Sequence, residues 1–280
     1  MRGSLLDLVR NALRSAAGRW GAFVLLVLVI GAIALPPLLQ DPAAIRDAAL
    51  GAQAPGGGHW LGTDVLNRDI LARLVNGARI SLAIAALATL LTATLGAGVG
   101  LVAGYSGGAV DSVLMRLVDA AMAIPRLFVL LLLVLVWDRI PPAALILVIG
   151  LTGWFATSRL VRSETLRLRQ EAFVTAAEAL GAPGWRVMLR HLLPNVAGPI
   201  IVTATLGIGD VILLEAGLSF LGLGIQPPTP SWGGMILESR SVMTSAPWTA
   251  IFPGMAIIAT VLSANMVGEA LRAALDPRIA

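Results

Sequence analysis

The chain has 280 residues, of which 57% are hydrophobic, and its mean hydropathy is +0.86. Because soluble domains contain about 45–50% apolar residues, this composition excludes a soluble globular core as the basis of the fold. There is no cysteine, which excludes disulfides and thiol chemistry, and His59 and His191 are the only histidines, which leaves little for a metal site. All 20 basic residues are arginine, and the net charge of only +4 gives no indication of nucleic-acid binding.

The N-terminal region combines an amphipathic segment with a first apolar stretch. We predict that residues 1–19 lie along the cytoplasmic membrane surface with their apolar side chains toward lipid. These side chains are Leu5, Leu6, Val9 and Leu13. The arginine-bearing start does not have the pattern of a cleavable signal peptide, and none is expected. Residues 20–39 form the first predicted transmembrane helix, which ends at Pro36 and Pro37.

Five further apolar stretches follow residues 40–79, which we assign to an external loop. Each is near the ~20 residues that cross the hydrocarbon core of a bilayer. Gly96, Gly100 and Gly104 are spaced four apart in the first stretch, which favours close helix packing over a nucleotide-binding loop because no strand precedes them. The prediction is an all-α polytopic membrane protein with six transmembrane helices. The five stretches are residues 80–103, 117–137, 143–158, 196–223 and 251–271.

Arginine counts predict the orientation, because cytoplasmic loops are enriched in basic residues. With the N-terminus inside, 13 arginines fall on the cytoplasmic side and six fall outside. We therefore predict that both termini are cytoplasmic, that residues 159–195 face the cytoplasm, and that residues 225–249 form an external loop. Arg126 is the remaining arginine and falls within the expected third span.

The segment Glu171–Asn195 is the most ordered of the predicted loops, with the sequence EAFVTAAEALGAPGWRVMLRHLLPN. Small residues and glutamates predict a helix up to Leu180, and Gly181 can end it with a positive φ. Pro183 suits the first turn of a second helix, which we expect Pro194 to end. Such a helical loop between spans indicates a docking site for a soluble partner; a simple connector between the spans is the alternative.

The same segment resembles the EAA loop of ABC importer permeases. In that pattern EAA is followed by three residues, glycine, nine residues and I-x-L-P, and this spacing fits from Thr175 to Pro194. Thr175 replaces the glutamate and His191 replaces the isoleucine, although H-x-LPN is similar to the version of the peptide and nickel branch. The resemblance implies an ATPase-docking site made of Glu171, Thr175, Ala176, Ala177, Gly181, Pro183, Trp185, Arg190, His191 and Pro194.

Three other segments are similar to the same branch. His59–Ser81 reads HWLGTDVLNRDILARLVNGARIS, Glu215–Trp232 reads EAGLSFLGLGIQPPTPSW, and Asn265–Pro277 reads NMVGEALRAALDP. The chain thus resembles a C-subunit-type permease of a dipeptide or oligopeptide ABC importer over residues 20–280, which implies a type I, MetI-like permease core, here residues 80–280. Four positions depart from the branch pattern: Asn67, Ala72, Glu269 and Ala273.

This resemblance implies a function and a set of partners. The chain would be a multi-pass permease of the bacterial inner membrane and would work with a second homologous permease, two ATPase subunits and an extracytoplasmic substrate-binding protein. ATP and Mg²⁺ would bind the partner ATPases, and no cofactor or metal is expected in this chain, which lacks a Walker A pattern and any lysine to complete one. A permease for nickel or another small solute is the alternative within the family.

Two alternatives belong to other classes. An intramembrane enzyme would need a compact catalytic set, whereas the candidate buried ionisable residues are spread over three spans. A self-powered secondary transporter would show repeated halves, which this sequence lacks. The candidate buried groups are Asp119, Arg126, Asp210, Glu215 and Glu269.

Asp210 is the charged residue closest to the middle of the expected fifth span. A carboxylate there costs about 2.5–3.5 kcal/mol on insertion scales, so it should face protein or a water-filled path. Pairing with Arg126 and lining a translocation path are the two hypotheses; Glu215 falls on another face, near the outer end. The residues that share the face of Asp210 are Thr203, Gly207, Leu214 and Gly217.

Polar motifs near the ends of the spans have local interpretations. Gly62–Asp64 is expected to form a turn and a helix N-cap, and ion pairs are expected between Asp69 and Arg73 and between Arg116 and Asp119. The proline-rich segment 227–230 stiffens an outer loop that either contacts the binding protein or covers the pore mouth. The predicted contact residues are Gln226, Pro227, Pro228 and Trp232.

Overall fold

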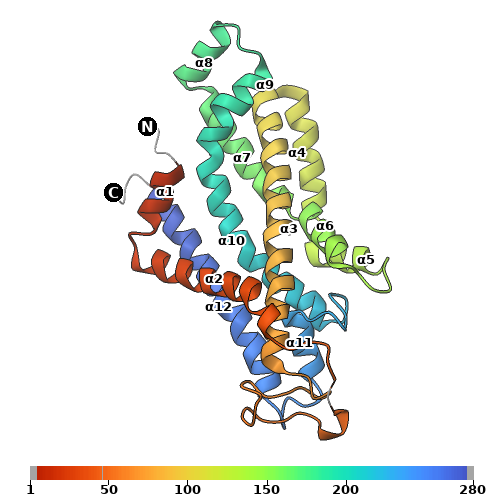
Figure 1. The fold of residues 1–280 in the computed structure, drawn as a ribbon. Coiled ribbons are helices and arrows are strands. Elements are labelled where there is room, and N and C mark those ends of the chain that lie inside the picture. The colour runs from red at the N-terminus through yellow and green to blue at the C-terminus, as the bar shows by residue number, and fades with distance from the viewer. Residues whose placement is uncertain (1–4, 46, 276–280) are drawn as a thin grey trace.

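The computed structural model describes residues 5–45 and 47–275, and this part of the chain is mainly helical. α8 and α9 lie at one end of the molecule, residues 47–69 and α11 lie at the other, and α3 runs between the two ends (Figure 1). The elements in chain order are α1 (Leu5–Ala12), α2 (Ala16–Ala34), η1 (Pro36–Leu38), η2 (Ala48–Leu50), α3 (Ile70–Ser106), α4 (Gly108–Met122), α5 (Arg126–Val134), α6 (Pro142–Leu151), α7 (Trp154–Arg169), α8 (Ala172–Ala179), α9 (Gly184–Val187), the π-helical turn η3 (Met188–Leu192), α10 (Leu193–Phe220), α11 (Trp232–Ser239) and α12 (Trp248–Leu275).

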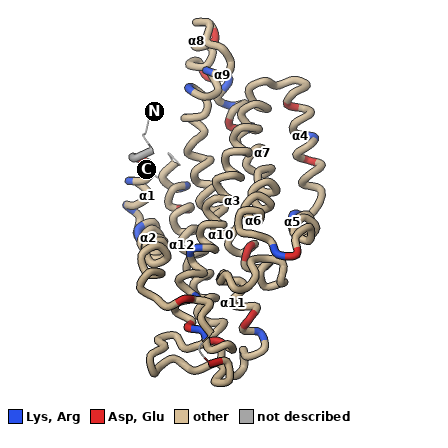
Figure 2. Tube along the Cα trace, turned by 45° about the vertical axis from the view of Figure 1, so that its right-hand side comes forward, with Lys and Arg blue, Asp and Glu red and all other residues tan. Residues whose placement is uncertain are grey.

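The number of membrane-spanning helices agrees with the prediction only if two bent pairs each count as one span. Within the described residues, four helices are long and apolar enough to cross a membrane, and up to six spans result when each bent pair is included. These four are α2, α3, α12 and the continuous helix Gly184–Phe220. Charged residues lie at both ends of the molecule and along α4 and beside α5 (Figure 2), whereas α3 carries none from Ile80 to Ser106.

The expected third and fourth spans are each made of two helices that meet at a bend, which we did not predict from the sequence. α4 and α5 meet at 78° around Pro125, because proline lacks an N–H and its ring clashes with the preceding turn. α6 and α7 meet at 42° at Thr152 and Gly153. Both bends therefore interrupt the backbone hydrogen bonding within the bundle.

α3 is the central helix of the bundle and begins earlier than predicted. The Asp69 carboxylate accepts a hydrogen bond from the Ala72 N–H at 2.8 Å and caps the helix at Ile70, ten residues before the predicted start of the span at residue 80. At the other end Gly107 stops the helix with φ +64°. Its 37 residues make a helix about 55 Å long, which exceeds the ~30 Å hydrocarbon thickness.

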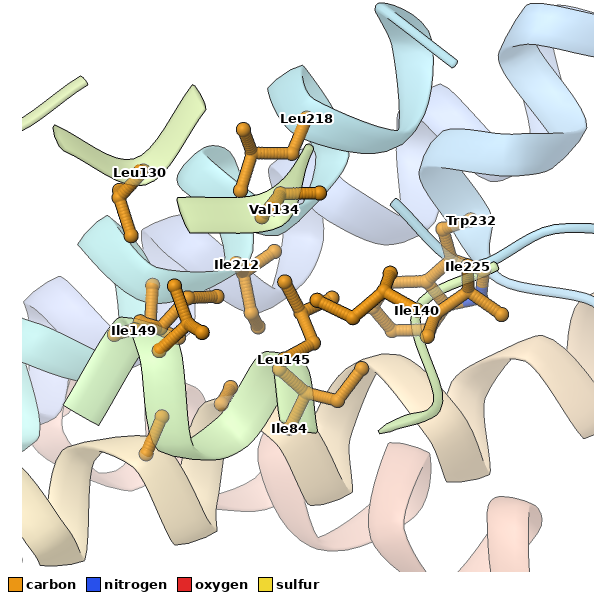
Figure 3. Close-up of a cluster of buried hydrophobic side chains, with 14 of the residues drawn as sticks. Ile84, Leu130, Val134, Ile140, Leu145, Ile149, Ile212, Leu218, Ile225 and Trp232 are labelled. Atoms are coloured by element: carbon orange, nitrogen blue, oxygen red, sulfur yellow. The ribbon is translucent and has the colours of Figure 1, made fainter. Parts of the chain in front are cut away.

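A buried hydrophobic cluster joins α3, α5, α6, α10 and α11 on the side of the bundle toward α11. Ile84, Leu145, Ile212 and Trp232 interdigitate there (Figure 3). Each of these side chains is at most 1% exposed. The cluster fixes α5 and α6, one helix from each bent pair, against α3 and α10.

α1 packs one face on the bundle and leaves another face exposed. Leu8 and Ala12 are buried in a cluster with Val202, Ala270 and Leu271, while Val9 and Leu13 remain exposed. Exposure of these last two side chains agrees with the predicted lipid face. The side chains of Leu5 and Leu6 lie outside the described part of the structure.

The predicted glycine face of α3 is confirmed as a packing surface against α7. A Cβ on Gly96 or Gly104 would lie 2.6–2.7 Å from the Cβ of Thr157 or Thr165. A Cβ on Gly100 would lie 2.6 Å from the carbonyl oxygen of Ser158. The two helices approach closely because these positions carry no side chain.

Gly100→Val should therefore destabilise the protein by about 1–3 kcal/mol or more, since the backbone carbonyl of Ser158 cannot move aside. The matched control is Gly98→Val, because a Cβ there has no atom within 4 Å and the helix-propensity change is the same. Thermal unfolding of the purified complexes measures the difference. Equal melting temperatures for the two variants would show that the close contact does not matter.

Candidate docking segment and translocation face

The docking segment begins with α8, which lies at the end of the molecule (Figure 1). Gly181 follows it with φ +78°. The Gly181 N–H donates to the Glu178 carbonyl at 2.9 Å and the Ala182 N–H donates to the Ala177 carbonyl at 3.0 Å. These two bonds form a Schellman motif, which requires the left-handed conformation that glycine adopts freely. The predicted break at Gly181 is therefore confirmed.

The second arm of the segment does not end at Pro194. α9 follows Pro183, widens into the π-helical turn η3, and continues directly into α10, whose first turn contains Pro194. The Leu193 N–H donates to the carbonyl of Met188 across the wide turn. The π turn lets the helix continue because it accommodates a proline that has no N–H to offer.

We call residues 171–195, with their break at Gly181, the elbow. Buried contacts attach the elbow to the helical bundle. Val174 of α8 and Val187 of α9 are fully buried in a cluster that includes Leu101 and Val161. A Cβ on Gly184 would lie 2.8 Å from the ring of Tyr105. The guanidinium of Arg169 lies 5.4 Å from the centre of the same ring. The elbow thus rests on the ends of α3 and α7.

The docking segment carries four large apolar side chains that are exposed. Leu180 is 89% exposed, and Phe173, Trp185 and Leu189 are 40–55% exposed. Phe173 and Leu180 were not predicted as contact residues; their signal is that large apolar side chains flank the small residues of α8. Exposed side chains of this size are consistent with the predicted docking role of the segment.

Most of the predicted docking residues share this surface, with two exceptions. Ala177 is buried, so it serves the attachment of α8 and not the outward face. His191 is half-buried in the π turn, where its carbonyl accepts a hydrogen bond from Asn195. The exposed predicted residues are Glu171, Thr175, Ala176, Gly181, Pro183, Trp185, Arg190 and Pro194.

One face of α10 is left uncovered. Asp210 and Gly217 are exposed, and Thr203 and Gly207 are half-buried. A Cβ on Gly217 would meet no atom within 4 Å. Leu214, which was expected on the same face, packs at the edge of the core cluster instead. Small residues and one carboxylate therefore border open space on this helix.

Glu215 lies on a different face of α10 from Asp210, as predicted, and this face is buried. It is 1% exposed and accepts hydrogen bonds from the hydroxyls of Ser219 at 2.8 Å and Ser81 at 3.2 Å. Ser81 also accepts a hydrogen bond from the Trp232 N–H at 3.2 Å. The glutamate therefore ties α3, α10 and the start of α11 together.

Arg126 begins α5 directly after the bend at Pro125. Its Nη2 donates to the carbonyl of Ile149 at 2.7 Å, and its Nε lies 3.4 Å from the Thr152 hydroxyl. Asp210 attracts Arg126 through space. Among the ion pairs of the described residues there is none between the two, so the close pair that we had considered does not form.

A cluster of four charged residues holds together the end of the molecule opposite α8, which we predicted to be external. Arg68 Nε donates to the Asp64 carboxylate at 2.7 Å, and Arg73 Nη2 donates to the Glu238 carboxylate at 2.8 Å. Arg68 also pairs with Glu238 and Arg73 with Asp64. Arg73 and Arg68 are 2% and 4% exposed. This external cluster (Asp64, Arg68, Arg73 and Glu238) connects the segment before α3 to α11.

The cluster sets the ionisation of Glu238. Burial alone would raise the pKa of Glu238, but the hydrogen bond from Arg73 and the charges of Arg73 and Arg68 outweigh burial and hold this pKa below its usual range. Glu238 is thus a structural part of this end of the molecule that the sequence alone did not reveal, because its partners lie 165 and 170 residues away.

Two predicted ion pairs are wrong. Asp69 caps α3 and contacts His59 Nδ1 at 2.8 Å, so it does not pair with Arg73. Asp119 pairs with Arg159 of α7 and not with Arg116. In both cases a partner from another element displaces the neighbour on the same helix.

Asp64 forms the predicted turn by accepting a hydrogen bond from the N–H of Leu66 at 2.9 Å, but it is not the helix cap.

The outer loop contains one residue that cannot contact a partner. Trp232 is 1% exposed and its Nε1 donates to the carbonyl of Leu74 at 3.0 Å, so its predicted role as a contact residue is wrong. Pro227 and Pro228 are exposed. Gln226 is half-buried and donates to the carbonyl of Asp138 at 3.3 Å.

Comparison with known proteins places this geometry in a family. Residues 96–280 match the family described as binding-protein-dependent transport system inner membrane component. The dipeptide transport system permease protein of Alkalihalophilus pseudofirmus is 40% identical over 92% of this chain and 85% of its own length. The glutathione transport system permease protein of Pectobacterium atrosepticum is 39% identical over 92% of this chain and 86% of its own length. The oligopeptide permease of Mycobacterium tuberculosis is 38% identical, with 96% and 93% coverage.

The chain therefore belongs to the family of inner membrane components of binding-protein-dependent transport systems. It is a permease of an ABC importer, as its EAA-like loop and helical fold predicted. These relatives are transport permeases, which argues against the alternative of an intramembrane enzyme.

Proposed function

We propose that the chain is the permease subunit of an ATP-driven importer of dipeptides or oligopeptides. The translocation path would form between this chain and a second homologous permease, and two ATPase subunits would supply the energy from ATP and Mg²⁺. The observation that carries the proposal is the docking elbow, whose large apolar side chains, above all Leu180, lie outward without cover. The peptide class is supported by the names of the relatives.

Each face of the molecule has a place in this proposal. The elbow 171–195 would seat in the ATPase and pass its closure to α10, with which it is continuous. Thr203, Gly207, Asp210 and Gly217 would border the path. The exposed prolines 227 and 228, with Gln226, would meet the extracytoplasmic binding protein.

Uptake by the reconstituted system tests the function. The chain, its partner permease, the ATPases and the binding protein are placed in proteoliposomes, and accumulation of labelled peptides is followed with and without ATP. Accumulation that requires ATP and the binding protein is expected. ATP-dependent uptake of a nickel complex without peptide uptake would contradict the peptide assignment.

The orientation follows from the same proposal, with both termini and the elbow cytoplasmic. In this cysteine-free chain, Ser163→Cys should resist a membrane-impermeant thiol reagent applied from outside and react after permeabilisation. Thr244→Cys, which is equally on the surface, should react in both conditions. Labelling of Ser163→Cys from outside would reverse the topology.

A further inference from the structure

A hollow of about 420 Å³ lies where the two bent pairs face each other. It is lined by residues next to both bends, including Pro125 and Arg126 on one side and Thr152 and Gly153 on the other. Met122 and Phe155 contribute apolar walls. Its volume falls within the ~300–1,000 Å³ typical of small-molecule sites. The hollow is thus a largely apolar space with one fixed cation.

Arg126 is held in place by the backbone of α6. Its bond to the Ile149 carbonyl lies at the C-terminal turn of α6, where a cation is favoured. Gly153 makes room for it, because a Cβ there would lie 2.8 Å from Nη2 of Arg126. The guanidinium has more N–H donors than its two contacts to Ile149 and Thr152 use. The remaining donors are available to an anion in the hollow.

Asp210 of α10 carries the opposite charge and lies outside the lining of the hollow. Its side chain is exposed on the uncovered face of α10, and it acts electrostatically on Arg126 without forming an ion pair with it. A simple anion at Arg126 would be repelled by Asp210, whereas a molecule with an anionic and a cationic end would satisfy both groups. A peptide with free termini is such a zwitterion.

We propose that the hollow and Asp210 form a zwitterion site on the translocation path, in which Arg126 binds the terminal carboxylate of a peptide and Asp210 attracts its terminal amino group. This inference rests on the proposed peptide import and adds which ends of the peptide the membrane subunit recognises. The apolar walls leave side-chain identity unspecified, as a path for varied peptides requires.

The test crosses protein variants with peptide variants in the complete reconstituted transporter. Uptake is measured for one tripeptide with free termini, with an amidated C-terminus and with an acetylated N-terminus. Because the binding protein is the same throughout, its own preference cancels when the ratio of free to modified peptide is compared between variants. Arg126→Gln should reduce the free-to-amidated ratio about tenfold, and Asp210→Asn should reduce the free-to-acetylated ratio similarly.

Arg116→Gln is the matched control, since this exposed arginine of α4 is absent from the hollow. It should leave both ratios unchanged. Wild-type ratios in Arg126→Gln and Asp210→Asn overturn the site, although the proposed function stands if the wild-type complex imports peptides. Failure of the wild-type complex to import any peptide instead overturns the proposed function.

Two further measurements keep the proposal testable. If the complex with Arg126→Gln does not assemble, Ala156→Trp is the second variant, because it fills the hollow and leaves the hydrogen bonds of Arg126 in place. It should lower uptake of the free peptide at least tenfold. Unchanged uptake overturns the site. Native mass spectrometry detects a phospholipid headgroup as the alternative occupant. A bound lipid that Arg126→Gln removes, together with unchanged peptide ratios, also overturns the peptide site.

Discussion

Gly181→Val is expected to uncouple the permease from its ATPase subunits. The substitution puts a β-branched residue at φ +78°, which costs about 1–2 kcal/mol or more and breaks the Schellman end of α8. A Cβ there meets no atom within 4 Å, so the cost is backbone strain and not a clash within the chain. Co-purification of ATPase subunits with the tagged permease should show an affinity about tenfold lower, and uptake should fall with it.

Gly181→Asn is the matched control, because asparagine tolerates the left-handed conformation far better than valine while also adding an exposed side chain. It should retain most of the ATPase binding. If Gly181→Val keeps both ATPase binding and uptake at wild-type levels, residues 171–195 are not the docking site. Equal losses in both variants would assign the effect to side-chain bulk at the interface instead of to φ.

Arg73→Ala is expected to have the largest effect on stability, about 3–5 kcal/mol, because it leaves the carboxylates of Asp64 and Glu238 with Arg68 as their remaining partner in the external cluster. Arg79→Ala is the control, since Arg79 is on the same helix and exposed. Thermal unfolding of the purified complex measures both. Similar melting temperatures for the two variants would contradict a stabilising role of the cluster.

Acid should weaken the same cluster in the wild type. Because the folded pKa of Glu238 is depressed, its contribution to stability is fully present above its unfolded pKa of about 4.3 and is lost as the pH falls through the lower folded value. Glu238→Gln should therefore flatten the pH dependence of unfolding below that value. An unchanged acid profile in this variant would show that Glu238 does not contribute.

Patterns that depend on neighbours in the sequence predicted the structure well. Gly96, Gly100 and Gly104 lie on one helix face because of the helical period, and Gly181 ends α8 because the break needs a positive φ. Hydropathy located all six apolar stretches, but not the bend at Pro125, since hydropathy does not report backbone geometry. The surface role of Trp185 followed from the loop pattern.

Partners that are distant in the sequence were the source of the errors. Arg73 and Asp69 are four apart, but Glu238, 165 residues further along the chain from Arg73, captures the arginine. Trp232 was assigned to a surface because it follows an exposed proline segment, yet it fills a space beside Ile225 that only the folded bundle creates. Such competition between local and remote partners is decided by burial, which one sequence does not report.

The uninterrupted course of α3 has a mechanical consequence. Arg73 fixes its first turns to Asp64 and Glu238, and Tyr105 near its last turn lies against Gly184 of the elbow. A continuous helix of about 55 Å behaves as a stiff rod, whereas the bends of 78° and 42° beside it are places where a chain can flex. A push at the elbow would therefore travel along α3 to the outer surface with little loss, while the joints on either side of the hollow at Arg126 absorb the change of angle.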